Sequence, residues 1–145
     1  PGNAPPPAPP PMKLTKDGAA GRDLFFDSSR FPGCSDCHAA GNMGGVVAAK
    51  LTANTTIDNI RNVRTTQVQT AQVPGEPEFP AIIAQVTSDT MRIYDLSARI
   101  PVLRSFPKVD VILKPGSKWN HSAAVSRYSS TDLELILVFI RATQR

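Results

Sequence analysis

Hydrophobic positions predict helices near both ends of the chain. Residues 15–30 carry an apolar face and predict a first helix, and residues 56–64 predict a shorter one with Thr55 or Thr56 as its N-cap. Residues 133–143 are apolar almost all round, which predicts a well-buried final helix. The apolar positions behind the first two predictions are Leu24, Phe25, Phe26, Ile57, Ile60 and Val63.

Polar residues mark the start of that final helix. The stretch Ser129-Ser130-Thr131 offers N-cap side chains. Asp132 and Glu134 follow in the first turn, where the helix dipole favours negative charge.

The middle of the chain, from about 65 to 113, has the composition of strands. It is rich in Val, Ile, Thr and Gln and is interrupted by Pro, Gly, Ser and Asp. Around residue 93 the alternation of Met91 and Ile93 with Arg92 and Tyr94 is typical of a half-exposed hairpin. Short strands in meander order are predicted near 66–73, 81–87, 90–96 and 99–106.

The first twelve residues form a Pro-rich tail, and residues 13–145 are expected to form one domain. We interpret residues 1–12 as a semi-rigid linker that tethers the domain to a membrane anchor or to another domain. No apolar stretch is long enough to span a membrane, and nothing resembles a signal peptide. Because the first residue is Pro1, we interpret the chain as processed or excised, so the missing signal does not argue against export.

Composition and charge are those of an ordinary globular protein. Of the 145 residues, 41% are hydrophobic and 19% charged, and the net charge is +4. The basic residues are scattered rather than clustered on a recognisable motif, so we do not expect nucleic-acid binding.

The candidate chemistry lies in one short stretch. Both cysteines of the chain fall in Cys34-Ser35-Asp36-Cys37-His38, which has the spacing of the c-type haem attachment motif. Two thiols separated by two residues can add to the two vinyl groups of one haem and form two thioether bonds. The adjacent His38 is then the proximal ligand of the iron.

Three other interpretations of the same residues remain open at this point. A thioredoxin-like pair would open a helix after a strand, whereas here a predicted helix precedes the motif. A zinc site could use both cysteines, His38 and His121, but the usual spacing between ligand pairs is missing. A structural disulfide between Cys34 and Cys37 is the third alternative.

The sequence around the motif resembles class I cytochrome c domains. The stretches that carry the resemblance are 21–26 (GRDLFF), 34–41 (CSDCHAAG) and 128–133 (YSSTDL). In that family the first and last helices cross beside the haem. The resemblance therefore implies a close approach of these helices at Gly21, with Phe25, Leu137 and Ile140 near the crossing.

The resemblance covers residues 16–50 and 118–143, and the strand-rich middle departs from the commonest small members. It is similar to a subset associated with quinoprotein-type dehydrogenases, in which a small sheet precedes the last helix. The stretch 104–111 (RSFPKVDV) carries this second likeness. The implied fold is a mostly α cytochrome c fold around a covalent haem, with a small antiparallel β-sheet inserted at about 65–113.

The distal ligand of the iron decides the redox potential and whether the iron is open. Met12 lies in the Pro-rich tail and Met43 is too close in sequence to His38, so neither is expected to bind. His121 lies in a predicted polar loop before the last helix, where the family places its distal ligand. We therefore expect His121 as the distal ligand, with Met91 or an open, water-bound site as the alternatives.

These observations predict a monohaem c-type cytochrome that transfers single electrons and is itself no enzyme. The alternatives are a haem domain of a larger redox enzyme, and a haem protein with an open distal site for a small ligand. The expected cofactor is one covalent haem c. The expected partners are redox proteins, among them a quinoprotein-type dehydrogenase, and the expected location is the bacterial periplasm or another extracytoplasmic space.

Overall fold

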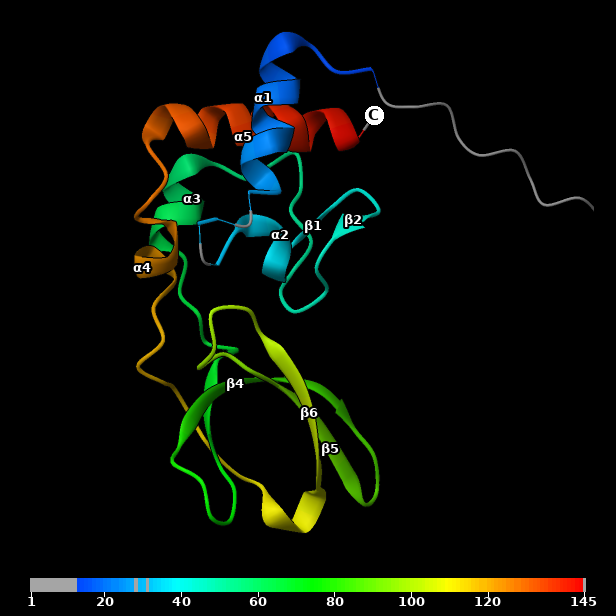
Figure 1. The fold of residues 1–145 in the computed structure, drawn as a ribbon, viewed down its shortest axis with the longest axis vertical. Helices are drawn as coiled ribbons and strands as arrows, with labels where there is room; N and C mark the ends of the chain where they lie inside the picture. The colour runs from blue at the N-terminus through cyan, green and yellow to red at the C-terminus, as the bar shows by residue number, and fades with distance from the viewer. Residues whose placement is uncertain (1–12, 28, 31, 145) are drawn as a thin grey trace, which may run out of the picture.

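Helices gather at one end of the molecule and a β-sheet at the other (Figure 1). The computed structural model describes residues 13–27, 29, 30 and 32–144, so the predicted Pro-rich linker 1–12 lies outside the described residues. The helices are α1 (Lys16–Phe25), α2 (Cys34–Cys37), α3 (Ile57–Asn62), α4 (His121–Val125), α5 (Ser130–Thr143) and the 3₁₀ turn η1 (Lys108–Asp110). The strands are β1 (Ala39–Ala40), β2 (Met43–Gly44), β3 (Gln69–Gln72), β4 (Phe79–Val86), β5 (Thr90–Asp95), β6 (Val102–Pro107) and β7 (Ile112–Lys114).

Side-chain caps fix where three of the helices begin. The Thr15 hydroxyl accepts from the backbone of Gly18 at 3.0 Å, and the Thr56 hydroxyl accepts from Asn59 at 3.1 Å. At α5 the capping is reciprocal: Ser129 and Asp132 each accept a backbone N–H from the other at 3.0 Å. The expected second and final helices are confirmed, with Thr56 as the cap of α3.

Helices α1 and α5 cross at Gly21, as the family resemblance implied. A Cβ on Gly21 would overlap the backbone carbonyl of Leu135, so only glycine allows this approach. Next to the crossing the rings of Phe25 and Phe139 lie 5.6 Å apart. The buried residues that form this helical core are Phe25, Ala40, Val125, Tyr128, Leu133, Ile136, Leu137, Phe139 and Ile140.

Two local predictions need correction, and one segment without a prediction forms a helix. The first helix was expected over 15–30, but α1 ends at Phe25 because Asp27 forms a turn, accepting from the backbone of Ser29 at 3.0 Å. The Cys-x-x-Cys segment forms the short helix α2. His121 was expected in a loop, but it is the first residue of α4, which Asn120 caps by accepting from Ser122 at 2.8 Å.

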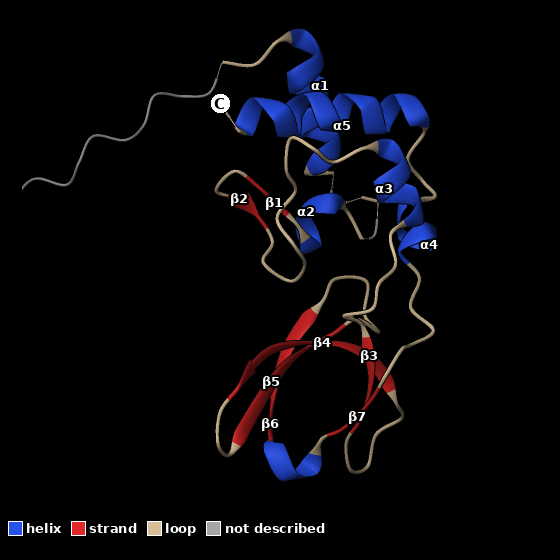
Figure 2. Ribbon diagram, turned by 180° about the vertical axis from the view of Figure 1, so that it is seen from behind, coloured by secondary structure: helices blue, strands red, loops and turns tan. Residues whose placement is uncertain are grey.

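Strands β3–β7 form one five-stranded antiparallel sheet with the order β6-β5-β4-β3-β7. Figure 2 shows the strands curling around a common interior. Along β5, Met91 and Ile93 point into the core of the sheet and Arg92 to solvent. Buried Asp95 is paired with Arg104 at 3.0 Å, and the Arg104 guanidinium also lies over the rings of two phenylalanines.

The expected mostly α fold is wrong. The described residues are 32% helix and 24% strand, so the protein is mixed α/β with a substantial antiparallel sheet. The sheet has a core of its own, built around Phe79, Met91 and Ile93, rather than being a small insertion on a helical body. Its last strand, β7, was not predicted, because it is three residues long and is defined by its pairing with the distant strand β3.

No helix among the described residues is long and apolar enough to cross a membrane.

Candidate functional site

Helix α2 presents Cys34 and Cys37 within a single turn. The chain enters this turn at Gly33, whose N–H donates to the Asp36 carboxylate at 2.8 Å. The N–H of His38 then donates to the carbonyl of Cys34 at 2.8 Å and ends the turn. Both thiols and the imidazole of His38 line the same cavity.

A glycine-rich loop packs on α2 and orients His38. Nδ1 of His38 lies 2.6 Å from the carbonyl oxygen of Ala49, so Nδ1–H donates and Nε2 keeps its lone pair. Two backbone hydrogen bonds of 2.9 Å hold the loop in place. The N–H of Gly45 donates to the His38 carbonyl, and the N–H of Ala48 donates to the Cys37 carbonyl. Gly44, at φ +106°, passes so close that a Cβ there would overlap the His38 carbonyl.

Helix α4 carries His121 to the opposite side of the cavity. The Ser122 hydroxyl donates to the carbonyl of Arg61 at 2.8 Å and joins α4 to α3. The ring of Trp119 lies edge-on to that of His121, with 6.0 Å between centroids. His121 is therefore placed by the contact between two short helices rather than by a flexible loop.

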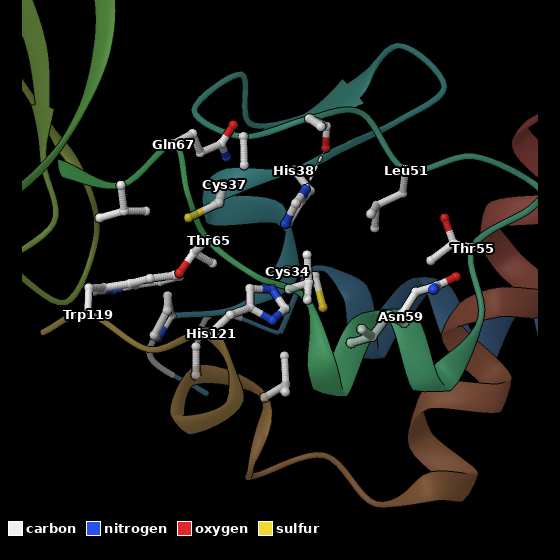
Figure 3. A pocket seen from close by; sticks show the side chains of 18 of the residues that line it. Cys34, Cys37, His38, Leu51, Thr55, Asn59, Thr65, Gln67, Trp119 and His121 are labelled. Carbon is white, nitrogen blue, oxygen red and sulfur yellow. Dashed lines mark hydrogen bonds between the residues drawn. The ribbon is translucent and has the colours of Figure 1, made fainter. Parts of the chain in front are cut away.

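The two imidazoles face each other across the cavity. Their ring centroids are 6.2 Å apart and their planes are nearly perpendicular, at 82°. Figure 3 shows one ring nitrogen of each histidine turned toward the other ring, with the sulfur atoms of Cys34 and Cys37 on either side. Residues that are distant in the sequence thus meet at one point.

The cavity has a volume of about 390 Å³, within the usual range of cofactor sites of about 300–1,000 Å³. Helices α3, α4 and α5 supply much of its wall. Ile82 of β4 and Leu96, which directly follows β5, also line it. Arg64 and Lys50 are basic residues in the lining. The apolar lining residues include Leu51, Ile60, Val63, Val68, Ile82, Leu96, Ala124, Val125, Leu133 and Ile136.

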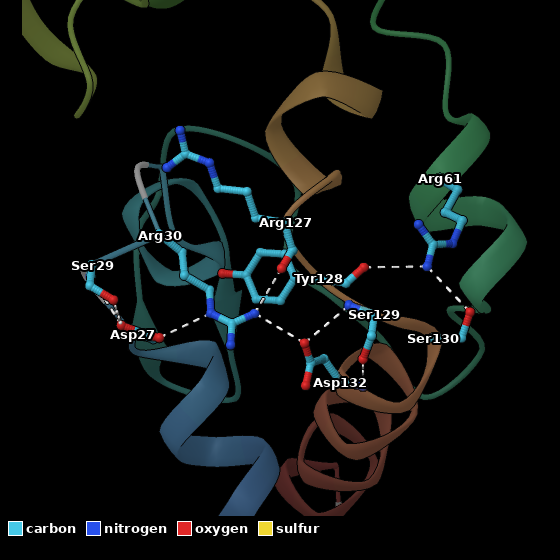
Figure 4. Close-up of polar contacts among 9 residues, drawn as sticks. All are labelled: Asp27, Ser29, Arg30, Arg61, Arg127, Tyr128, Ser129, Ser130 and Asp132. Carbon is cyan, nitrogen blue, oxygen red and sulfur yellow. Dashed lines mark hydrogen bonds and ion pairs between the residues drawn. The ribbon is translucent and has the colours of Figure 1, made fainter.

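A polar network joins the segment before α2 to the start of α5 (Figure 4). Arg30 forms ion pairs of 3.0 Å with both Asp27 and Asp132. Its guanidinium also lies over the ring of Tyr128, 4.8 Å from the centroid. Tyr128 is only 2% exposed and lines the cavity next to Cys34, so the network supports the wall of the site.

Burial keeps the four predicted site residues uncharged. It raises the pKa of Cys34 and, helped by the Asp36 carboxylate, raises the pKa of Cys37 to about 11. It lowers the pKa of His38 against the opposing effect of the Ala49 hydrogen bond. It also lowers the pKa of His121, to which repulsion from His38 contributes. A redox-active Cys-x-x-Cys needs a lowered thiol pKa, so a thioredoxin-like role is disfavoured.

The structure brings four of the predicted residues together and leaves one apart. Cys34, Cys37, His38 and His121 all line the cavity. Met91, the alternative ligand, is 7% exposed in the core of the sheet and is not part of that lining.

Sequence reasoning missed the groups that orient the histidines. Ala49 acts through its backbone carbonyl, which no side-chain pattern reveals. The tie from Ser122 to Arg61 depends on how α3 and α4 pack and also had no local signal. Asn120 could have been found, because Asn directly before a short apolar stretch is an N-cap signal.

Among the described residues, no group of three or more His, Cys, Asp or Glu side chains is arranged to hold a metal ion. That finding disfavours the zinc site that Cys34, Cys37 and both histidines would have formed. Comparison with known proteins adds no assignment: no protein-family model matches the chain, and no curated protein matches it.

Proposed function

We propose that the chain is a c-type haem protein that carries single electrons. Cys34 and Cys37 would hold one haem through thioether bonds, and His38 and His121 would be its axial ligands. The observation that carries this proposal is the pair of facing imidazoles in the cavity that both cysteines line.

The spacing of the two rings fits two ligands on one iron. An imidazole nitrogen binds a metal ion at about 2 Å, and the ring centre lies roughly 1 Å behind it, so two opposed imidazoles have centres about 6 Å apart. The centroids of His38 and His121 are 6.2 Å apart. A porphyrin supplies the other four nitrogen ligands, so the protein needs no third or fourth ligand of its own.

The environment of the site suits electron transfer. When bound, a haem supplies an iron that alternates between its ferric and ferrous states. His38 is held by Ala49 in the tautomer that keeps the Nε2 lone pair available, and the lining around the rings is largely apolar. If both imidazoles bind the iron, no coordination position is left for a substrate while both stay bound, and outer-sphere electron transfer is the chemistry that the site then supports.

His121 is favoured over Met91 because Met91 packs against Phe79 and Ile93 in the sheet core. Two histidine ligands imply a lower reduction potential than a histidine–methionine pair, since methionine raises it. We further propose an extracytoplasmic location, because thioether attachment takes place there in bacteria, and a redox protein such as a quinoprotein-type dehydrogenase as the partner.

The test is expression in a bacterial periplasm together with a haem attachment system. We expect the wild-type chain to keep its haem in a denaturing gel. The double variant Cys34→Ser with Cys37→Ser should not keep it. The single variant Met91→Leu, which keeps a residue of similar size in the sheet core, is the control that should retain it. A wild-type chain that folds and carries no covalent haem under these conditions would contradict the proposal.

A further inference from the structure

The two facing histidines are supported unequally. Nδ1 of His38 donates to the carbonyl of Ala49 at 2.6 Å. Nδ1 of His121 is buried and has no hydrogen-bond partner within the described part of the chain. The backbone of Ile60 is near enough to raise the pKa of His121, but it makes no hydrogen bond of acceptable geometry.

This difference affects how well each imidazole binds a metal. A ring whose N–H is donated to a carbonyl is a more basic ligand and is held in one orientation. His38 has this support and His121 lacks it. His121 is therefore expected to be the weaker and more easily displaced of the two ligands.

The element that carries His121 is short and is tied to its neighbour by one side-chain hydrogen bond. Helix α4 has five residues, and its preceding loop contains Gly116 at φ +75°. The hydrogen bond from the Ser122 hydroxyl to the Arg61 carbonyl ties α4 to α3 next to the histidine. Displacing the ring from the cavity would break this bond and the edge contact with Trp119, while Val125 of the same helix belongs to the helical core.

We infer that His121 is an exchangeable ligand and that its side of the cavity takes a small neutral diatomic molecule. The inference rests on the proposed function. The walls contributed by α3 and α4 include Ile60, Ala124 and Val125, whose apolar side chains accept a small neutral ligand. In the exchange the bond from iron to His121 breaks and a bond from iron to the incoming molecule forms. No electron or proton is transferred, and His121 leaves as neutral imidazole.

The test is titration of the ferrous holoprotein with carbon monoxide, followed by its absorption spectrum. We expect wild type to bind, and His121→Ala to bind more tightly because no ligand has to leave. Ser122→Ala should bind carbon monoxide about fivefold more tightly than wild type, which is the effect of losing one hydrogen bond. Ser126→Ala is the matched control, because its hydroxyl donates to Ala123 within α4 and should leave the affinity unchanged.

The outcomes separate this inference from the function on which it rests. Wild type that does not react in CO-saturated buffer, while His121→Ala reacts fully, would overturn the exchange and leave the proposed function intact. Equal affinities of wild type and Ser122→Ala for carbon monoxide would show that the hydrogen bond from Ser122 to Arg61 does not hold His121 in place. A chain without covalent haem would instead contradict the proposed function itself.

Discussion

The orientation of His38 depends on residues without functional side chains. The carbonyl of Ala49 selects the tautomer of His38, and the backbone bond from Gly45 fixes its carbonyl. Gly44 lies closer to His38 than any residue with a Cβ could. At the residue scale the site is therefore built by backbone groups of one loop.

Replacing Gly44 should disturb this arrangement. In Gly44→Ala the alanine would occupy the left-handed region at φ +106° and would overlap the His38 carbonyl. We expect the free energy of unfolding to fall by about 3 kcal/mol. The fraction of chains that carry covalent haem should fall as well. Urea unfolding and haem staining measure the two effects.

Gly75→Ala is the matched control for backbone strain. Gly75 has φ +79°, but nothing lies within 4 Å of an added Cβ. This variant should lose about 1–2 kcal/mol and keep its haem. Equal losses of stability and haem in the two variants would show that crowding against His38 is unimportant.

Two contacts join α5 to the part of the chain that precedes α2. One is the crossing of α1 and α5 at Gly21, and the other is the bridge from Arg30 to Asp132 at the start of α5. The crossing depends on the absence of a side chain at Gly21, whereas the bridge depends on the charges of Arg30 and Asp132. A larger side chain at residue 21 should therefore weaken the crossing, whereas a change of pH should weaken the bridge.

Gly21→Ala tests the helix crossing. An added methyl group would overlap the backbone of Leu135, so the helices must separate. We expect a loss of about 3 kcal/mol in the free energy of unfolding. Gly18→Ala, on the same helix, would meet mainly side-chain atoms at 3.3–3.5 Å and should change stability by about 1 kcal/mol or less. Similar values for both variants in denaturant titrations would refute the close crossing.

Acid should weaken the bridge to α5. The backbone hydrogen bond from Ser129, followed by the Arg30 side chain, lowers the pKa of Asp132. Because the folded pKa lies below the unfolded one, the stabilisation is complete above about pH 4 and is lost as the pH falls through the folded pKa. In Asp132→Asn the free energy of unfolding should depend less on pH below about pH 4.

Asp23→Asn is the control for the loss of one carboxylate, since the Asp23 side chain is 74% exposed. If Asp132→Asn and Asp23→Asn flatten the pH profile equally, then the bridge does not account for the acid sensitivity. Unfolding should be followed by circular dichroism across the acid range.

In the whole molecule the cavity joins the helices to the sheet. Its lining includes Ile60 and Val125 from helices, Ile82 from β4 and Leu96 just after β5. The helical core and the sheet core are otherwise separate clusters. A cofactor in this cavity would therefore contact both parts and stabilise their association.

Loss of the cofactor should lower the stability of the entire chain. We expect the double variant Cys34→Ser with Cys37→Ser, isolated without haem, to keep its helix and strand content. Its Tm should be lower than that of the holoprotein by about 10 °C or more, since a ligand bound only by the folded state adds to stability. Calorimetry with equal Tm values for the two forms would contradict a cofactor that bridges helices and sheet.

The sequence predicted what depends on neighbouring residues. The caps of α3 and α5 could be identified locally, whereas the close approach at Gly21 followed from the family resemblance. The mostly α fold was wrong because it was taken from the family resemblance of the two ends of the chain, whereas the strand-rich middle forms a sheet with a core of its own. Strand β7 could not be predicted because it is short and pairs with the distant strand β3. The support of His38 by Ala49 could not be predicted, since backbone carbonyls leave no pattern in a sequence.

The central claim is that His38 and His121 bind one iron between them. The most direct test is the absorption and EPR spectrum of the ferric holoprotein beside His121→Ala and Met91→Ala. The account predicts a low-spin wild type without a methionine–iron charge-transfer band, and a high-spin signal only in His121→Ala. A wild type that shows this band and loses it in Met91→Ala, or one that is already high-spin, would contradict the account.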